Sequence, residues 1–139
     1  MKRAIIIYHS KKGTTRRFGE EISTLLKSRE IQTTVVSLEA LDHSNLEAYD
    51  YVFIGAWTKG LMFFAQHPDK TWLSEASSLQ IHPASQIVLF TTYKLAIGSM
   101  FSVMRNKLGI RNREDVLEMK SKTGSLADSV AFNLDCYLS

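Results

Sequence analysis

The chain has 139 residues, of which 45% are hydrophobic and 22% are charged, a composition typical of a folded domain. Its 17 basic and 14 acidic residues give a formal net charge of +3, and they are too scattered to indicate a nucleic-acid-binding protein. No apolar run approaches the roughly 20 residues of a membrane span. The single cysteine, Cys136, excludes an internal disulfide and suits a reducing compartment. We therefore expect one cytoplasmic domain over residues 1–139, without a membrane span or a nucleic-acid partner.

The clearest local pattern lies near the start of the chain. An apolar, β-branched run at residues 4–8 predicts a strand, and the polar residues after it lead into a helical pattern. A loop between a strand and a helix leaves backbone N–H groups unpaired, and together with the helix dipole they favour an anion such as phosphate. Ser10, Thr14 and Thr15 add hydroxyl donors, and Gly13 lets the backbone approach closely.

Two better-known phosphate loops are absent from this stretch. The chain has no G-x-x-x-x-G-K-[ST], the loop of NTP-binding proteins, and no G-x-G-x-x-G, the turn of dinucleotide-binding proteins. The pattern Ser10-x-x-Gly13-Thr14-Thr15 therefore indicates a phosphate loop of another kind. A turn that is merely rich in helix-capping residues is the alternative.

The rest of the chain alternates strand and helix patterns. Strands are predicted at residues 33–38, 51–56, 86–91 and 115–119, and the last is expected at a sheet edge because its polar and apolar residues alternate. Helices are predicted from residues 67–69 onward, between Ser99 and Gly109, and over residues 125–138. The segments 39–50, 57–66 and 92–98 are predicted as connections, the first with at most a short helix.

This alternation predicts an α/β fold with helices on both faces of a parallel sheet. The commonest five-stranded version has the strand order 2-1-3-4-5 and binds its ligand beyond the carboxyl ends of strands 1 and 3, where the topology switches. The loops after strands 1, 3 and 4 should therefore converge on one site.

Two classes of protein share this architecture. Phospho-acceptor response regulators need carboxylates at the ends of strands 1 and 3, where this chain has His9, Ser10, Ala56 and Trp57, so that class is excluded. The two remaining loops carry aromatic residues, Trp57 and Tyr93, which suit a flat ring system. Together with the phosphate loop, these features resemble the flavodoxin family over essentially the whole chain, at the length of its short-chain type.

The resemblance implies a flavodoxin-like three-layer sandwich that binds FMN. It assigns the cofactor phosphate to the first loop, the faces of the flavin ring to Trp57 and Tyr93, and the reactive edge of the ring to the residues that follow Trp57. The implied cofactor-binding residues are Ser10, Lys11, Lys12, Gly13, Thr14, Thr15, Ala56, Trp57, Thr58, Lys59, Gly60, Thr91, Thr92, Tyr93 and Lys94. No catalytic residue and no metal ligand is implied.

Several of these residues have a purely structural alternative. Trp57 could be an ordinary rim aromatic, and Tyr93 could simply cover the core. His9 could face either the phosphate or solvent, and Phe63-Phe64 could cover the flavin, contact a partner or pack beneath the loop. The chain also departs from the family in its basic charge and in Lys12, where the family often has a threonine.

Three functions are compatible with this sequence. The first is an FMN-binding redox protein that carries electrons between a flavin reductase and an acceptor protein. The second is a small FMN-dependent oxidoreductase that acts on a quinone or a porphyrinogen-like molecule. The third is a flavin-free regulatory or interaction domain.

The basic charge predicts a shift in redox potential. Flavodoxin carriers are generally acidic, and carboxylates disfavour the anionic, two-electron-reduced flavin, whereas Lys59 and Lys94 should favour it. One unit charge about 10 Å away, at an effective dielectric constant near 20, contributes roughly 1–2 kcal/mol, or some tens of millivolts. We expect a redox titration of the FMN-loaded protein to give a hydroquinone potential less negative than that of acidic flavodoxins; an equally low potential would contradict this argument.

Overall fold

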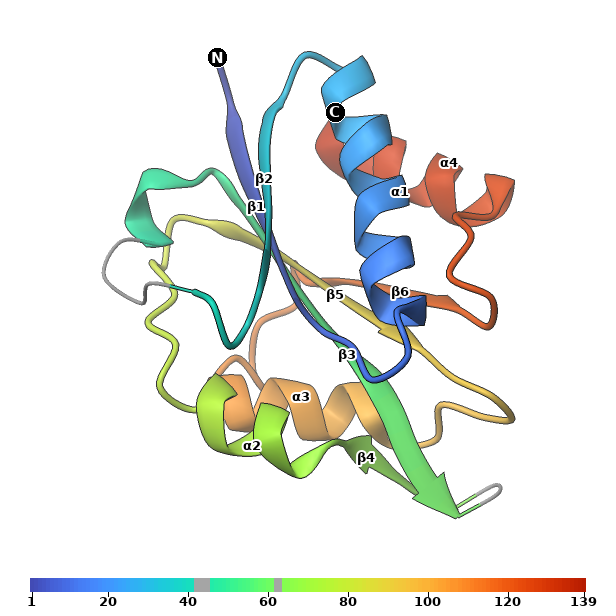
Figure 1. The fold of residues 1–139 in the computed structure, drawn as a ribbon. Coiled ribbons are helices and arrows are strands. Elements are labelled where there is room, and N and C mark those ends of the chain that lie inside the picture. Colours follow the sequence, from blue (N-terminus) through green and yellow to red (C-terminus); the bar gives the residue numbers. More distant parts are fainter. Residues whose placement is uncertain (42–45, 62–63) are drawn as a thin grey trace.

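The structure is a computed structural model that describes residues 1–41, 46–61 and 64–139; side chains within residues 60–67 lie outside the description. Five strands pair in parallel in the order β2-β1-β3-β5-β6 (Figure 1). Their bounds are Arg3–His9 for β1, Gln32–Ser37 for β2, Tyr51–Leu61 for β3, Gln86–Thr92 for β5 and Leu117–Ser121 for β6. This confirms the predicted order 2-1-3-4-5.

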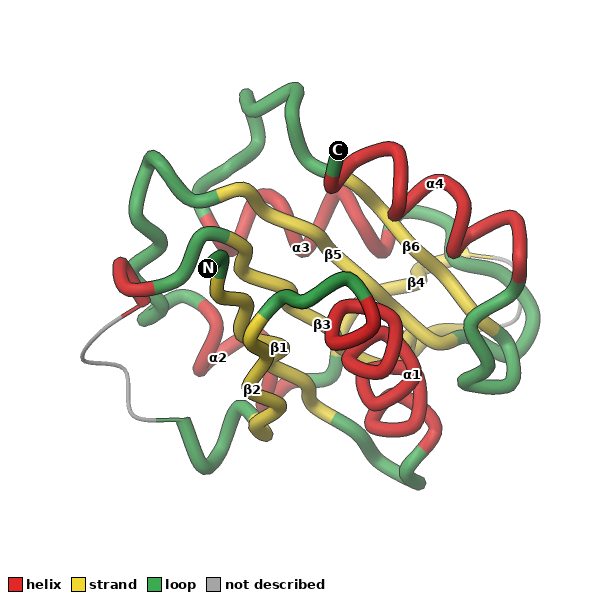
Figure 2. The backbone as a smooth tube through the Cα atoms, turned by 90° about the horizontal axis from the view of Figure 1, so that it is seen from above, coloured by secondary structure: helices red, strands yellow, loops and turns green. Residues whose placement is uncertain are grey.

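Helices cover both faces of the sheet, as Figures 1 and 2 show. One face carries α1 (Thr14–Ser28) and α4 (Asp128–Leu138), and the other carries α2 (Lys70–Ala76) and α3 (Met100–Leu108). A short 3-10 helix, η1 (Leu46–Ala48), lies in the connection between β2 and β3. Within the described residues, no helix is both long and apolar enough to cross a membrane.

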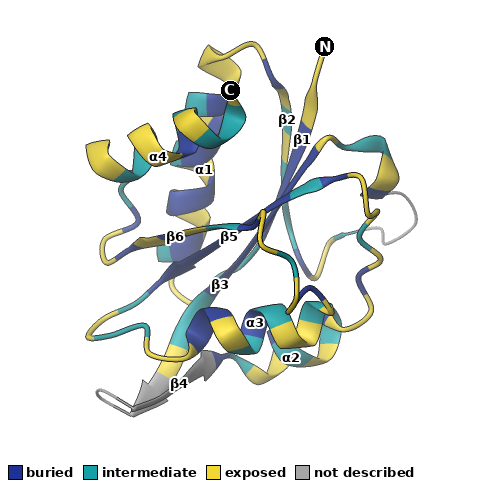
Figure 3. Ribbon diagram, turned by 180° about the vertical axis from the view of Figure 1, so that it is seen from behind, coloured by how far each residue is buried: buried dark blue, intermediate teal, exposed yellow. Residues whose placement is uncertain are grey.

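The core consists of two apolar layers, one on each side of the sheet. Because side chains alternate along a strand, Ile6 of β1 packs toward α1 and α4, whereas Ile5 and Ile7 pack toward α2 and α3. Figure 3 shows the strands as the most deeply buried part of the molecule. Most exposed residues lie on the outer helix surfaces and in the loops, and some, such as Lys59 and Lys120, lie in strands. The central strands are therefore held rigidly from both faces, and their ends are fixed in space.

The segment between β3 and α2 differs from the prediction. Residues 57–66 were predicted as a loop, but β3 continues to Leu61 and pairs with an antiparallel strand, β4 (Phe64–Pro68). The prediction was wrong because Thr58, Lys59 and Gly60 carry no strand pattern of their own, and the pairing partner determines their conformation. Pro68 ends β4 and does not begin the helix; Asp69 is the N-cap of α2, where its carboxylate accepts a hydrogen bond from the Thr71 N–H at 3.4 Å.

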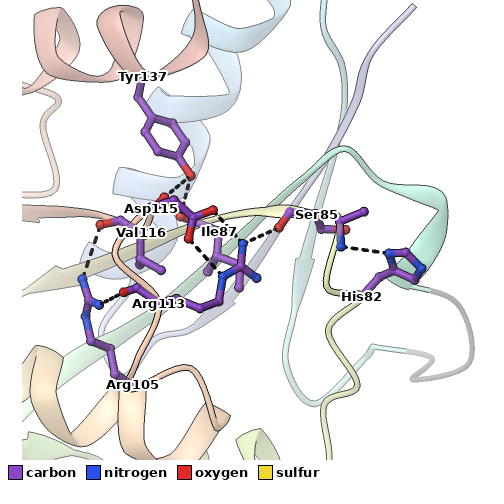
Figure 4. A network of polar contacts seen from close by, with 9 residues as sticks. His82, Ser85, Ile87, Arg105, Arg113, Asp115, Val116 and Tyr137 are labelled. Atoms are coloured by element: carbon purple, nitrogen blue, oxygen red, sulfur yellow. Dashed lines mark hydrogen bonds and ion pairs between the residues drawn. The ribbon is translucent and has the colours of Figure 1, made fainter.

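A polar network fixes the amino-terminal edge of the sheet, opposite the strand ends that carry the site (Figure 4). Arg113 forms an ion pair with Asp115 at 2.8 Å and donates a hydrogen bond to the Ser85 carbonyl at 3.0 Å. The Tyr137 hydroxyl donates to the carbonyls of Ile87, at 3.0 Å, and Asp115, at 2.8 Å. Burial raises the pKa of Tyr137 to about 12, so this hydroxyl stays protonated and the network holds α4 against β5 and β6 at ordinary pH.

One glycine is required by the packing of the sheet. Gly55 of β3 lies beside Phe90 of β5 in the parallel register, and a Cβ atom at position 55 would lie 2.1 Å from the Phe90 ring. The Phe90 ring in turn packs edge-on against Phe18 of α1, with 5.7 Å between the ring centres. The absence of a side chain at Gly55 thus lets Phe90 fill the space between the sheet and α1.

We expect the Gly55→Ala variant to lose about 3 kcal/mol of unfolding free energy, because the added methyl group forces the Phe90 ring out of its packed position. Urea unfolding followed by circular dichroism measures this loss. Gly19→Ala is the matched control: its Cβ would lie 3.3 Å from Ile6, and the gain in helix propensity offsets that tighter contact. If Gly55→Ala is as stable as the wild type, this account of the packing is incorrect.

Candidate functional site

A cavity of about 390 Å³ opens at the carboxyl ends of the parallel strands. Segments that follow β1, β5 and β6 meet there with the second half of β3, as the topology of the sheet requires. The lining residues are Ser10, Lys11, Lys12, Thr14, Thr15, Trp57, Thr58, Lys59, Thr92, Tyr93, Lys94, Leu95, Ala96 and Lys122. None of them is a carboxylate, so within the described residues this cavity is suited to an anionic ligand.

The loop between β1 and α1 presents a helix N-terminus to the cavity. Gly13 is the N-cap of α1 and has a φ of 90°, in the left-handed region that favours glycine. The Gly13 N–H donates a hydrogen bond to the Ser10 hydroxyl at 3.0 Å, which closes the loop on itself. No side chain caps α1, so its first backbone N–H groups and its dipole are directed toward a ligand.

Threonine hydroxyls connect the elements beneath the cavity. Thr15 of α1 and Thr92 of β5 are both buried, and their hydroxyl oxygens lie 2.6 Å apart. The Thr91 hydroxyl contacts the Ala56 carbonyl at 2.7 Å and the Thr58 hydroxyl at 2.8 Å. The first turn of α1 and the ends of β3 and β5 are therefore held in a fixed arrangement.

Two aromatic side chains line the cavity. Trp57 of β3 is partly buried, and its indole Nε1 is buried without a hydrogen-bond partner among the described residues. Tyr93 follows β5, and the Lys122 ammonium lies 5.8 Å from its ring centre. On the Trp57 side, the Lys11 ammonium lies 5.1 Å from the indole ring. Trp72 Nε1 is likewise buried and unpaired among the described residues but belongs to the core, whereas Trp57 lines the cavity, where a ligand could supply the missing acceptor.

The structure brings most of the sequence-predicted residues to this cavity. Ala56 and Thr91 are fully buried and do not line it, although they support the residues that do. Gly13 lies in the loop between lining residues, and Gly60 lies in β3 where its surroundings are outside the description. Phe63 also lies outside the described residues, as does the side chain of Phe64.

Three lining residues were not predicted: Leu95, Ala96 and Lys122. Leu95 and Ala96 lie in the connection after β5, where the prediction rested on the aromatic and lysine side chains. Lys122 follows β6, and the rule that parallel strands end at the same edge would have indicated it.

His9 is predicted to face either the phosphate or solvent, but in the structure its ring faces two carboxylates. The side chain is only 12% exposed, and its Nδ1 contacts the carboxylate of Glu39. Its Nε2 lies 3.1 Å from Asp69, whose other oxygen lies 4.0 Å from the Lys59 ammonium. Each ring nitrogen of His9 thus faces one carboxylate. His9 thus joins the start of the phosphate loop to the start of α2.

The pKa of Asp69 reflects two opposing effects of its surroundings. Burial by itself would raise the pKa of this carboxyl, but hydrogen bonds from His9 and from the Thr71 N–H outweigh it, so the net pKa lies below the ordinary value. The carboxylate therefore remains ionised at ordinary pH and stabilises the cluster.

Comparison with known proteins gives one family. The model described as "Flavodoxin" matches residues 6–81. A search of curated proteins finds no significant match. Among solved structures, oxidised flavodoxin 1 from Bacillus cereus aligns with a TM-score of 0.71 at 18% identity, over 99% of this chain and 95% of that one. Two-electron-reduced Megasphaera elsdenii flavodoxin aligns with a TM-score of 0.71 at 15% identity, over 92% of this chain and 93% of that one.

The same fold also occurs inside a longer protein. Rubredoxin–oxygen oxidoreductase from the anaerobe Desulfovibrio gigas aligns with a TM-score of 0.67 at 13% identity, over 99% of this chain but 34% of that one. At these identities the structural matches establish the fold, and the family model carries the assignment.

The His9–Asp69 contact predicts a pH-dependent contribution to stability. Because the pKa of Asp69 is lowered by folding, its contribution is present above the unfolded value and disappears as the pH falls through the folded value. We expect Asp69→Asn, which keeps a good N-cap, to lose about 1–3 kcal/mol at pH 7 and progressively less below about pH 4. Urea unfolding at several pH values measures the difference.

Asp128→Asn is the control for this experiment, because Asp128 is an exposed carboxylate in the first turn of α4, away from any histidine contact in the described structure. It should change stability little at either pH. A constant loss for Asp69→Asn from pH 7 to pH 3 would show that the carboxylate charge has no part in the effect.

Proposed function

Because this chain belongs to the flavodoxin family, whose model matches more than half of it, we propose that it carries electrons between a flavin reductase and an acceptor protein. Flavodoxins bind FMN and transfer electrons to partner proteins, so the chain is an FMN-binding electron-transfer flavoprotein. The identities of the reductase and acceptor belong to the proposal, as does a location in the reducing cytoplasm, which the single cysteine favours.

One observation carries this proposal: the uncapped N-terminus of α1 and the two aromatic residues line the same cavity. The helix N-terminus and the surrounding hydroxyl and ammonium groups suit a phosphate, whereas Trp57 and Tyr93 suit a flat ring. The unpaired Nε1 of Trp57 and the absence of a lining carboxylate among the described residues fit a ligand that brings acceptors and negative charge.

The residues have separate roles in this proposal. The loop from Ser10 to Thr15 holds the phosphate, largely through backbone N–H groups, with Lys11 and Lys12 adding positive charge. Trp57 and Tyr93 enclose the ring and exclude water from it. The remaining residues proposed to border the cofactor are Thr58, Lys59, Gly60, Thr92 and Lys94, and Ala56 and Thr91 support them from below.

When bound, FMN supplies one-electron redox chemistry, which no side chain of this protein provides. The protein binds and orients the cofactor. The buried Thr15–Thr92 contact fixes α1, whose N-terminus would face the phosphate, relative to β5. Tyr93 follows directly after β5, so its position depends on the same strand. No side chain is proposed to act as an acid, a base or a nucleophile.

A second candidate is a small FMN-dependent oxidoreductase that acts on a quinone or a porphyrinogen-like molecule. The lysines around the cavity favour a porphyrinogen-like substrate over a quinone, because they would attract its carboxylates and a quinone is neutral. The occurrence of the fold within the D. gigas oxidoreductase adds an analogy at the level of fold alone. Saturable turnover of such a substrate by the isolated, FMN-loaded protein would support this candidate; inactivity without a reductase and a partner would support the carrier.

The flavin assignment is tested first by the visible spectrum of the purified or FMN-reconstituted protein and by quenching of FMN fluorescence on titration with apoprotein. We expect one FMN per chain, and weaker binding of riboflavin, which lacks the phosphate. A protein that neither shows flavin bands nor quenches FMN fluorescence would be a flavin-free domain.

A glycine substitution then tests the phosphate loop. A Cβ at Gly13 meets no atom within 4 Å, but the φ of 90° strains any other residue, so Gly13→Ala distorts the loop without filling the cavity. We expect about a tenfold loss of FMN affinity, from roughly 1–2 kcal/mol of strain, and little change in riboflavin affinity.

Gly109→Ala is the matched control, because Gly109 has a φ of 71°, also has no atom within 4 Å of a built Cβ, and ends α3. It should lower stability to a similar extent and leave FMN affinity unchanged. An equal loss of FMN and riboflavin affinity in Gly13→Ala would contradict a phosphate-binding role for the loop.

A further inference from the structure

The open side of the cavity is surrounded by exposed lysines that come from separate parts of the chain. We call these residues the basic rim: Lys11, Lys12, Lys59, Lys94, Lys120 and Lys122. They lie in the loop before α1, in β3, in the connection after β5, in β6 and just beyond it. Tertiary structure thus collects six of the chain's 17 basic residues around one opening.

The basic rim differs from the arginine-rich parts of the surface in how its charge is balanced. Away from the rim, four arginines form ion pairs within the fold: Arg16 with Glu20, Arg29 with Asp135, Arg105 with Glu118 and Arg113 with Asp115. Among the described residues, the only carboxylate within ion-pair distance of a rim lysine is Asp69, 4.0 Å from Lys59, and it is already bonded to His9. Six positive charges with little compensation among the described residues therefore surround one opening, which favours an anionic partner there.

Apolar side chains lie among these lysines. Leu95 is 54% exposed, and it is the large exposed hydrophobic residue that lines the cavity; Trp57 and Tyr93, which also line it, are partly exposed. Lys120 and Lys122 lie 6.0 and 5.8 Å from the centre of the Tyr93 ring. A surface that combines aromatic and aliphatic side chains with charged ones is typical of a protein–protein interface.

We propose that the basic rim and Leu95 form a docking surface for a redox partner whose own surface is rich in carboxylates. This inference rests on the proposed function. A flavin bound in the cavity would leave an outer surface with solvated lysines on long side chains, and such a surface fits an acidic protein face better than it encloses a small anion. Charge complementarity would steer the encounter and orient the acidic partner over the flavin edge.

The first test measures the local field with two small oxidants of opposite charge. The FMN-loaded, reduced protein is mixed in a stopped-flow instrument with ferricyanide, a trianion, or with tris(phenanthroline)cobalt(III), a trication. We expect oxidation by ferricyanide to slow as ionic strength rises and oxidation by the cobalt complex to accelerate, because salt screens attraction and repulsion alike. The opposite pair of salt dependences would overturn the proposal.

Charge reversal then locates the field. Lys120→Glu with Lys122→Glu should slow the ferricyanide reaction at low ionic strength by about tenfold or more and remove its salt dependence. Lys27→Glu with Arg111→Glu is the control: both positions are exposed, one at the end of α1 and the other before β6, at the edge opposite the cavity. Each pair of substitutions changes the net charge from +3 to −1, so equal effects of the two pairs would show that net charge, and not the rim, is responsible. The flavin spectrum confirms loading of each variant before kinetics are measured.

The second test needs no electron transfer. Isotope-labelled, FMN-loaded protein in its oxidised form is titrated with an oxidised acidic [2Fe–2S] ferredoxin or with oxidised, basic cytochrome c, and amide shifts are followed by NMR. We expect ferredoxin to shift resonances of Lys94, Leu95 and Lys122, the double rim variant to lose these shifts, and cytochrome c to leave them unchanged.

Ferricyanide steering without ferredoxin binding would show that the rim serves a small anion and would overturn the protein-docking proposal. A protein that binds no FMN would instead fail the spectral test above. A flavin-loaded protein with reversed salt dependences would leave the carrier function standing and refute this inference alone.

Discussion

The parallel pairing of β1 with β3 is the constraint on which the rest of the site depends. It places Tyr8 beside Gly55 and His9 beside Ala56, so that the loop before α1 and the Trp57 segment begin at the same level of the sheet. The pairing of β3 with β5 extends this level to Thr92 and Tyr93. Because all three strands are buried on both faces, a shift of register would move apolar side chains into the wrong layer. The cavity is thus a consequence of how the core packs.

The packing of the core and the chemistry of the site are connected through small residues. Gly55 provides the space for Phe90, which packs against Phe18 of α1, and the same helix directs its N-terminus at the cavity. At the outer end of α1, the buried Thr15–Thr92 contact ties the first turn to β5. Apolar packing against Phe90 and the Thr15–Thr92 hydroxyl contact therefore both fix the orientation of α1, and with it the direction of the helix dipole toward the cavity.

The site and the rest of the surface differ in their electrostatics. Four arginines form ion pairs within the fold, and the Arg113–Asp115–Tyr137 network closes the edge of the sheet remote from the site. At the cavity, in contrast, lysines lie side by side with little compensation among the described residues. The lysine charges repel one another, but salt and solvent screen this repulsion at exposed positions. The fold tolerates the remaining cost because its stability comes mainly from the core.

The sequence by itself determined the fold and much of the site, since these depend on local patterns. Buried strands appear as apolar runs, and their alternation with helices indicates a parallel sheet. In the commonest five-stranded order, the topology then fixes where Ser10, Trp57 and Tyr93 must meet. Tertiary structure alone decided the features that join distant segments. The extension of β3 depends on its pairing with β4, the position of His9 depends on Glu39 and Asp69, and Lys122 reaches the cavity from the far end of the chain. No local pattern records such contacts, because each side chain has its partner only once the chain has folded.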